Sequence, residues 1–250
     1  MLNILLHGCN GKMGQAVTAA VNDRKEMQII CGVDPYGTSN YDYPVYDSFD
    51  KISEKVDVII DFSNPALLAS LCAYSEENKI PCVICTTGLD DNQKAMIDKL
   101  STVCPVFFTG NMSLGVNLLI ELSKKATVVF GEAFDIEIVE KHHNQKLDAP
   151  SGTALMIADG ISTVRDEATR YVYDRHSYRA KRAKSEIGIH SVRGGTIVGE
   201  HSVIFAGNDE VLTITHQAQS KSLFATGALS AADFTSKQAP GLYEMSDMLK

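Results

Sequence analysis

The residues best suited to chemistry lie in one short segment, residues 140–154. It combines two imidazoles, an ammonium group and a hydroxyl-bearing turn: His142, His143, Lys146, Ser151, Gly152 and Thr153. An imidazole can donate a proton near neutral pH, and a lysine supplies positive charge. A helix pattern begins at the Ser-Gly-Thr turn, and backbone N–H groups at a helix N-terminus bind anions well. The segment therefore suits a small dianionic substrate that receives a proton during reaction.

A glycine-rich turn near the N-terminus is the second candidate site. Residues 8–14 read Gly-Cys-Asn-Gly-Lys-Met-Gly, follow a strand pattern and open a helix pattern. Glycines there permit a tight turn and let a pyrophosphate approach the backbone. The spacing GxxGxxG differs from the commoner GxGxxG, so an ordinary glycine turn is the alternative. Asp34 ends the second strand pattern 20 residues after Gly14, where a carboxylate can bind the adenosine ribose, and this context favours a dinucleotide site.

Polar residues also follow three later strand patterns of the first half. Ligands bind beyond the carboxyl ends of parallel strands, so these turns suit ribose and nicotinamide contacts. Each turn taken alone has an equally good explanation as an ordinary turn. Together with the glycine turn they give the candidate cofactor site: Gly8, Cys9, Asn10, Gly11, Lys12, Met13, Asp34, Phe62, Ser63, Cys85, Thr86, Thr87, Gly110, Asn111, Met112 and Ser113.

The elements that must position these residues change character along the chain. The first half alternates short apolar runs with helix patterns, which predicts a doubly wound parallel sheet with helices on both faces. The apolar runs are residues 2–7, 27–33, 56–61, 82–85 and 106–109. A long helix over 114–129 follows, and four strand patterns with few helices among the last three then predict a mixed α+β part. The predicted fold class is therefore α/β, a Rossmann-like doubly wound parallel sheet domain joined to a mixed α+β domain.

Composition excludes several classes of function. The chain has 250 residues, 44% of them hydrophobic, and a net charge of -8. An acidic balance argues against general binding to nucleic acid or anionic membranes. No apolar run reaches the roughly 18 residues of a membrane span, and the N-terminus reads as a first strand rather than a signal peptide. All six cysteines lie in the first half, which indicates reduced thiols in a cytoplasmic protein.

The chain resembles the 4-hydroxy-tetrahydrodipicolinate reductases, formerly called dihydrodipicolinate reductases, over essentially its whole length. The segment 140–154 matches the family's signature without a gap. Five further motifs carry the resemblance: residues 8–14, 61–63, 86–88, 111–113 and 193–201. The resemblance implies a homotetramer whose domain of residues 1–112 and 222–250 binds NADH or NADPH. It also implies that residues 113–221 bind substrate and build the tetramer.

The same resemblance implies a reaction and a role for each matching residue. Hydride passes from the nicotinamide to ring carbon C4 of a cyclic imine dicarboxylate, and water is lost to give tetrahydrodipicolinate in lysine and diaminopimelate biosynthesis. His142 matches the proposed proton donor, and Lys146 matches a second donor that also contacts a substrate carboxylate. His143 matches a substrate-binding imidazole. Ser151, Gly152 and Thr153 match the turn that holds a carboxylate.

The cofactor preference is a separate expectation. Some family members carry a basic residue directly after the acid at the second strand's end, where it favours the 2′-phosphate of NADPH. Pro35 stands there, although Lys12 in the glycine loop can supply a phosphate contact. We therefore expect use of both cofactors with a modest preference for NADH.

Several residues have simpler explanations than a site. The histidines show no metal-ligand spacing, so no metal is expected. Cys82 and Cys85 form a CxxC within a strand pattern, where residues three apart face opposite ways, so two packed thiols are expected rather than a redox pair. Residues 165–185 are charged and poorly periodic, which predicts an exposed loop. Its cations could guide a dianion, but a solvated loop is the preferred interpretation: Arg175, Arg179, Lys181, Arg182 and Lys184.

Two other functions compete with the reductase. A homoserine-type or semialdehyde dehydrogenase would share the first half, but an acylating enzyme needs a cysteine nucleophile in its second domain, and none follows Cys104. A non-catalytic NAD-binding sensor would not require the proton donors His142 and Lys146. Both alternatives are therefore disfavoured.

Overall fold

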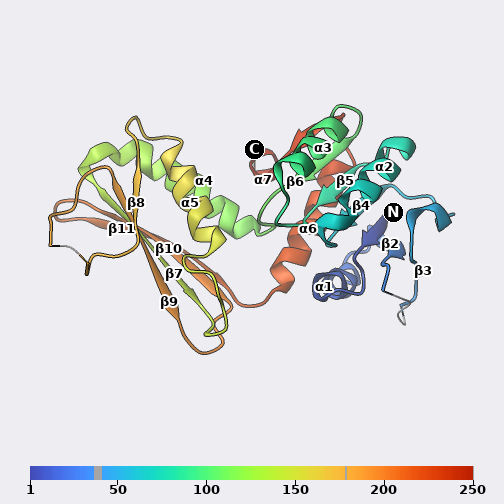
Figure 1. Cartoon of the computed structure of the whole chain (residues 1–250), viewed down its shortest axis with the longest axis horizontal. Helices are drawn as coiled ribbons and strands as arrows, with labels where there is room; N and C mark the ends of the chain where they lie inside the picture. Colours follow the sequence, from blue (N-terminus) through green and yellow to red (C-terminus); the bar gives the residue numbers. More distant parts are fainter. Residues whose placement is uncertain (37–40, 178, 250) are drawn as a thin grey trace. The chain divides into compact units, whose positions relative to one another are not determined.

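The computed structural model describes residues 1–36, 41–177 and 179–249, and its contacts divide the chain into two compact units (Figure 1). Unit 1 comprises Met1–Ser113 and Ser222–Lys250, and unit 2 comprises Leu114–Lys221. Unit 1 contains a parallel sheet and unit 2 a mixed one, as the sequence pattern predicts. Among the described residues, no helix combines the length and apolarity that a bilayer span requires.

Unit 1 is built on a seven-stranded parallel sheet in the order β12-β6-β5-β4-β1-β2-β3. Its strands are β1 (Leu2–His7), β2 (Met27–Val33), β3 (Val45–Tyr46), β4 (Val58–Asp61), β5 (Cys82–Ile84), β6 (Pro105–Phe108) and β12 (Gly241–Tyr243). The order from β3 to β6 is 3-2-1-4-5-6, which is that of a Rossmann sheet. The chain reverses direction across the sheet at β1 and β4, and ligands bind at this switch point.

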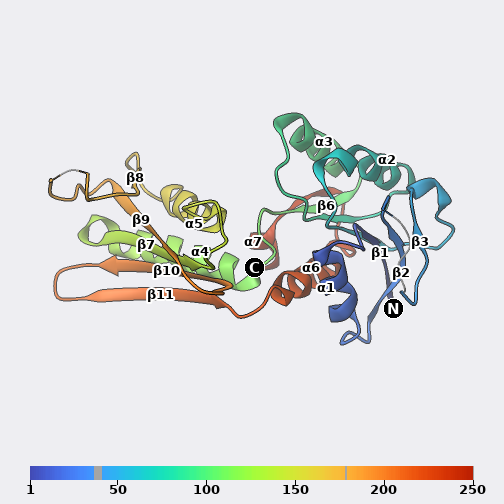
Figure 2. The same cartoon turned by 60° about the horizontal axis from the view of Figure 1, so that its bottom comes forward.

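Helices cover both faces of the unit 1 sheet (Figure 2). Helices α1 (Lys12–Val21) and α6 (Ser222–Thr235) pack together on one face, and α2 (Leu68–Asn78) and α3 (Asp91–Ser101) pack together on the other. The short helices are η1 (Phe49–Lys51), η2 (Pro65–Leu67) and α7 (Met245–Met248). Because both faces are covered, the central strands are continuous apolar runs, and Leu5, Ile59 and Val106 are fully buried.

Unit 2 is a five-stranded mixed sheet in the order β11-β10-β7-β9-β8, with two long helices on one face (Figure 1). Its elements are α4 (Leu114–Phe130), η3 (Gly131–Ala133), β7 (Asp135–His142), α5 (Gly152–Ser162), β8 (Arg170–Val172), β9 (Glu186–Arg193), β10 (Gly199–Ala206) and β11 (Val211–Ala218). Side chains alternate along β7, so Ile136, Ile138 and Glu140 are buried while their neighbours are only partly so. The buried face of β7 therefore carries two apolar side chains followed by the buried carboxylate of Glu140.

The charged segment 165–185 differs from the exposed loop that its sequence predicts. It contains β8, and the Arg182 guanidinium lies 3.0 Å from both Asp135 and Glu137. Arg175 pairs with Glu186 at 2.8 Å, and Lys184 pairs with Asp135 at 3.2 Å. Arg179 and Lys181 are exposed, as predicted. The solvated-loop prediction was wrong for Arg175 and Arg182, because acidic side chains on β7 and β9 pair with both.

Candidate functional site

The glycine turn of unit 1 begins where β1 ends. Gly8 has φ +78°, and a Cβ there would come within 2.6 Å of the Phe62 carbonyl oxygen, so only glycine fits without strain. A Cβ at Gly14 would collide with the carbonyl oxygens of Gly8 and Cys9. Gly11 precedes α1, and no side chain of the described residues caps that helix start. The turn thus brings an uncapped helix N-terminus close to the ends of β1 and β4, as an anion site requires.

Asp34 and the glycine turn share one cavity. The Asp34 carboxylate is almost fully buried and accepts hydrogen bonds from the backbone N–H groups of Asn10 and Tyr36, both at 3.0 Å. The cavity is about 290 Å³ and is lined by Gly8, Asn10, Gly11, Asp34, Pro35, Tyr36, Phe62, Ser63, Asn64 and Leu67. The glycine turn, the acid and the Phe-Ser turn, which the sequence predicts separately, therefore line the same cavity.

A buried group of polar side chains centred on Asp61 directly precedes Phe62 and Ser63, which line this cavity. The His7 Nδ1 and Asp61 Oδ1 atoms are 2.8 Å apart, and both side chains are 1% exposed. Asp61 also accepts hydrogen bonds from the Ser63 hydroxyl at 2.6 Å and the Thr86 hydroxyl at 2.7 Å. Burial alone would raise the pKa of Asp61, but the neighbouring His7 imidazole, and then the Ser63 and Thr86 hydroxyls, lower that pKa. The charged carboxylate thereby ties together the ends of β1, β4 and β5.

The other predicted cofactor residues lie at the carboxyl ends of strands or at the start of α1. Lys12, Thr87 and Gly110 are exposed, whereas the remaining ones are buried or half-buried: Cys9, Met13, Cys85, Thr86, Asn111, Met112 and Ser113. The Asn111 side chain accepts a hydrogen bond from the Ser113 N–H at 2.9 Å. None of these residues lines the 290 Å³ cavity. They lie along the same edge of the sheet, because parallel strands end together.

In unit 2, the predicted proton donor belongs to a hydrogen-bonded group. His142 is the last residue of β7, and its Nδ1 lies 2.6 Å from Glu140 Oε2. Arg193 donates to both Glu140 oxygens, at 2.8 and 2.7 Å, and the Ser151 N–H donates at 3.1 Å. Burial by itself would raise the pKa of Glu140, but the hydrogen bonds from Arg193 and His142 lower it to about 2. The carboxylate is therefore an anion at neutral pH.

A second imidazole lies beside the first. The rings of His142 and His201 are 5.2 Å apart in an edge-to-face arrangement. His201 Nε2 is 3.0 Å from the Ser151 hydroxyl, which in turn accepts from the Ala154 N–H and so caps α5. Burial, and then the charge of His142, lower the pKa of His201 to about 4. The His201 ring is therefore neutral, and Ser151 can donate its proton to Nε2.

The remaining predicted substrate residues flank this group. Strand β7 ends at His142, so the half-buried His143 begins the loop and is free of strand alternation. The Lys146 ammonium lies 2.8 Å from Asp148, and this contact lowers the pKa of Asp148. Gly152 opens α5, and Thr153 follows it in the first turn. These residues thus lie in one loop that runs from β7 to the start of α5.

Three members of the group have no role that the sequence predicts. Glu140 stood at the edge of the signature, and Arg193 and His201 stood in the matched block 193–201. For Glu140, the signal that could have been used is its position: it is a glutamate in the alternating pattern of a strand, at a position where the pattern otherwise has apolar residues. Its partner follows only from strand register, because β7 pairs with β9 so that His142 lies opposite Arg193.

The histidines and cysteines outside these groups form no metal or redox site within the described ranges. No set of three or more His, Cys, Asp or Glu side chains there could hold a metal ion. His190 instead pairs with Glu137 at 2.8 Å, and His216 lies against Gly115. All six cysteines are free and buried. Burial raises the pKa of the Cys82 and Cys85 thiols, so the CxxC behaves as two packed thiols.

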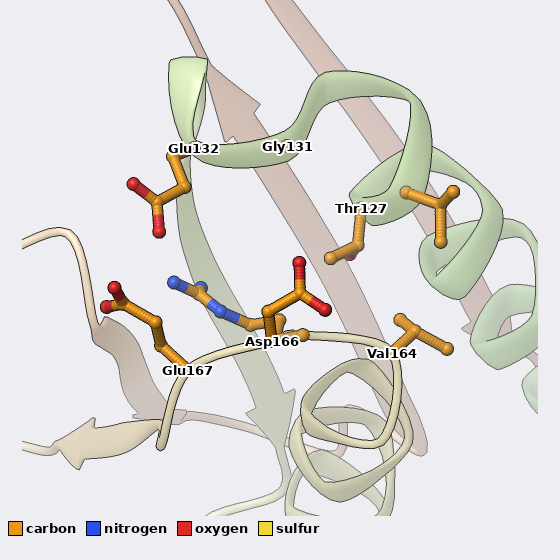
Figure 3. Close-up of a pocket in the computed structure, with 8 residues that line it drawn as sticks. Thr127, Gly131, Glu132, Val164, Asp166 and Glu167 are labelled. Carbon is orange, nitrogen blue, oxygen red and sulfur yellow. The ribbon is translucent and has the colours of Figure 1, made fainter.

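A further cavity of about 230 Å³ lies in unit 2, away from the predicted residues (Figure 3). It is lined by Thr127, Val128, Gly131, Glu132, Val164, Arg165, Asp166 and Glu167. Figure 3 shows that its labelled carboxylates come from two places, Glu132 from the turn after α4 and Asp166 and Glu167 from the loop after α5. The cavity shares no residue with the candidate site, so no function is assigned to it.

Sequence profiles from one family match nearly the whole chain. The sequence profile of the N-terminal part of dihydrodipicolinate reductase matches residues 2–112, and that of the C-terminal part matches residues 115–249. The 4-hydroxy-tetrahydrodipicolinate reductase of Caldanaerobacter subterraneus is 51% identical over 250 residues, which cover 100% of this chain and 99% of the relative. The Clostridium tetani enzyme of that name is 46% identical, covering 100% and 97% of the two chains.

A solved structure supports the same relationship. The dipicolinate-bound dihydrodipicolinate reductase of Paenisporosarcina sp. TG-14 superimposes with a TM-score of 0.82 at 26% identity, covering 98% of this chain and 97% of that one. A diaminopimelate dehydrogenase from Corynebacterium glutamicum, at 12% identity and a TM-score of 0.59, shares the fold alone. The chain belongs to the dihydrodipicolinate reductase family of oxidoreductases, whose members are now called 4-hydroxy-tetrahydrodipicolinate reductases.

Proposed function

We propose that this protein reduces 4-hydroxy-tetrahydrodipicolinate to tetrahydrodipicolinate with NADH or NADPH, with unit 1 holding the cofactor and unit 2 the substrate. The observation that carries the proposal is the pair of contacts that the Glu140 carboxylate accepts, from His142 Nδ1 and from the Ser151 N–H, which place the His142 imidazole beside the start of α5. A proton donor and an anion-binding helix N-terminus thus lie together, as reduction of a dicarboxylate requires.

The residues of unit 1 fit a dinucleotide. The space that a Cβ would fill at Gly8 and Gly14 is occupied by backbone, so the chain folds tightly enough for a pyrophosphate to approach the start of α1. Asp34 lines the same cavity and can accept a hydrogen bond from an adenosine ribose. The bound nicotinamide would supply hydride.

The residues of unit 2 supply the proton and bind the substrate. Hydride addition to a conjugated imine builds electron density that a proton must neutralise, and a positioned acid contributes roughly 10²–10⁴-fold in rate. We assign the proton to His142, whose Nδ1 is held by Glu140, and to Lys146 as a second donor. Lys146 and the turn Ser151–Thr153 bind the substrate carboxylates, and His143 contacts the substrate ring.

A coupled assay tests this proposal. Pyruvate and aspartate semialdehyde, with the preceding synthase, generate the unstable substrate in place, and absorbance follows oxidation of NADH or NADPH. We expect His142→Ala to lower kcat at least about hundredfold with little change in KM. Lys146→Ala should lower kcat and raise KM, while NADH binding stays unchanged.

A histidine outside the candidate site provides the control. His190 also pairs with a carboxylate of β7, so His190→Ala removes a comparable imidazole and should leave kcat within about twofold. Near wild-type turnover in both the His142 and Lys146 variants would refute the site. Absence of synthase-dependent oxidation by the wild type would refute the reaction itself.

We further propose a cytoplasmic homotetramer. The tetramer rests on membership in the family, and six free cysteines in one chain suit a reducing compartment. Light scattering of the same preparation tests the assembly, and a mass corresponding to one chain of 27.2 kDa would contradict it.

A further inference from the structure

We propose that Glu140 is the positioning residue of the candidate active site: it holds His142 in the tautomer that bears its proton on Nδ1, and it fixes the start of α5 beside that ring. The inference rests on the proposed function, because it takes His142 as the proton donor. The tautomer of His142 is a property of the resting protein, whichever substrate it binds.

The Glu140 carboxylate is surrounded by donors, and the Ser191 hydroxyl adds to the four contacts that follow. Oε1 accepts from Arg193 Nη2 at 2.7 Å and from the Ser151 N–H at 3.1 Å. Oε2 accepts from Arg193 Nη1 at 2.8 Å and lies 2.6 Å from His142 Nδ1. An ionised carboxylate offers about four lone-pair positions and no proton. His142 must therefore be the donor in its contact, which places a hydrogen on Nδ1.

Arg193 makes this arrangement possible in a buried place. The Glu140 side chain is fully buried, and a lone carboxylate there would be costly. The bidentate contact with Arg193 supplies the opposite charge and is the main favourable cause of a Glu140 pKa of about 2. Arg193 Nη2 also donates to the Asp148 carbonyl at 2.7 Å. The same ion pair therefore holds the loop that carries Lys146.

The other nitrogen of His142 has space beside it. A Cβ at Gly199 would come within 3.1 Å of His142 Nε2, so the glycine keeps room next to that atom. The neighbouring His201 cannot take the same role, because its Nε2 contacts Ser151 and its low pKa keeps it neutral. With Nδ1 committed to Glu140, Nε2 is the atom that can carry the transferable proton.

The tautomer is measurable on the wild-type protein without any assay. Long-range ¹H–¹⁵N spectra of protein labelled at histidine distinguish protonated from unprotonated ring nitrogens, and the spectrum of His142→Gln identifies the signals of His142. In the neutral His142 ring, we expect the hydrogen to reside on Nδ1. A neutral His142 with its hydrogen on Nε2 would overturn the proposal.

A matched pair of variants tests the consequence for catalysis. Glu140→Gln keeps the size of the side chain but removes the charge, and we expect kcat to fall about hundredfold with a smaller change in KM. Among the described residues, the charged groups around the His142 and His201 rings are Glu140, Arg193 and Lys146, and His201 itself is neutral. Without the anion the imidazolium is less stable, so the alkaline limit of the kcat profile should move to lower pH.

Glu137→Gln is the control for this variant. Glu137 lies on the same strand and pairs with His190 at 2.8 Å and Arg182 at 3.0 Å, but it lies on the other face of the sheet. We expect its kcat and its pH limit to match the wild type. An unchanged pH profile and kcat in a folded Glu140→Gln protein would refute the proposal.

Failure of the inference is distinguishable from failure of the proposed function. If the wild type does not turn over the substrate, the proposed function fails while the tautomer experiment still decides the role of Glu140. If the wild type is active and His142 has the wrong tautomer, the inference alone fails. Should Glu140→Gln not fold, the wild-type spectra still decide which tautomer Glu140 holds.

Discussion

At the end of β2, single side chains determine which nicotinamide cofactor the protein can favour. Asp34, Pro35 and Tyr36 line the cavity beside the glycine turn. An acid at this point repels a 2′-phosphate, and Pro35 offers no compensating charge. We predict that Pro35→Arg raises kcat/KM for NADPH about three- to tenfold while the value for NADH stays within twofold, as measured in the coupled assay.

The control for this change is Pro35→Gln, which relaxes the backbone in the same way without adding charge. It should leave the ratio of the two kcat/KM values near that of the wild type. An equal gain with glutamine would show that backbone freedom, rather than charge, limits NADPH use. A wild type that uses NADPH more than about tenfold better than NADH would contradict the expected preference.

At the residue scale, the candidate site can be predicted from the sequence where its residues lie close together along the chain. His142, Lys146 and the turn 151–153 lie within a span of twelve residues, so their types and spacing indicate a site. The role of Glu140 was not predictable in the same way, because its partner Arg193 is 53 residues away. That contact depends on the pairing of β7 with β9, which periodicity does not specify.

At the scale of elements, Asp61 joins three strand ends of unit 1, and its loss should destabilise that unit. Asp61→Asn removes the charge that faces His7 and weakens the bonds from Ser63 and Thr86. We predict a loss of about 3 kcal/mol in the free energy of unfolding at pH 7. Urea titration followed by circular dichroism measures it.

The pH dependence of this effect follows from the lowered pKa of Asp61. A carboxyl whose pKa is lower in the folded state contributes its full stabilisation above its unfolded pKa, about 3.9, and loses it as pH falls further. The gap between wild type and Asp61→Asn should therefore narrow below about pH 4. Asp57→Asn removes a carboxylate that accepts a hydrogen bond from the Asn3 N–H and should cost about 1 kcal/mol or less. A gap that is independent of pH would contradict the role of the charge.

Elements were predictable in proportion to their length and periodicity. The long helix α4 and the central strands follow from apolar runs, whereas β3, β8 and β12 have only two or three residues and gave no pattern. The prediction that segment 165–185 is a solvated loop was wrong for another reason. Its charges resemble a solvated loop, but acids on β7 and β9 pair with Arg175 and Arg182, and such long-range pairs leave no local signature.

At the scale of the whole molecule, the six cysteines allow the opening of one unit to be measured separately from that of the other. All of them lie in the part of the chain that forms unit 1, and all are buried. Burial raises the pKa of Cys9 and Cys31 to about 12, so a thiol reagent must await an opening of that unit. Thiol labelling in the native protein therefore reports the opening of unit 1.

This property gives a test of cofactor binding that does not involve turnover. If NADH binds unit 1, a concentration of about 100 times Kd stabilises the closed unit by about 2.7 kcal/mol, and labelling should slow about hundredfold. The related Paenisporosarcina structure contains dipicolinate. If the proposed function is correct, dipicolinate binds unit 2 of this protein, so at the same excess it should slow labelling far less. Labelling that dipicolinate slows and NADH does not would contradict the assignment of the cofactor to unit 1, because only a ligand of the unit that holds the thiols can oppose its opening directly.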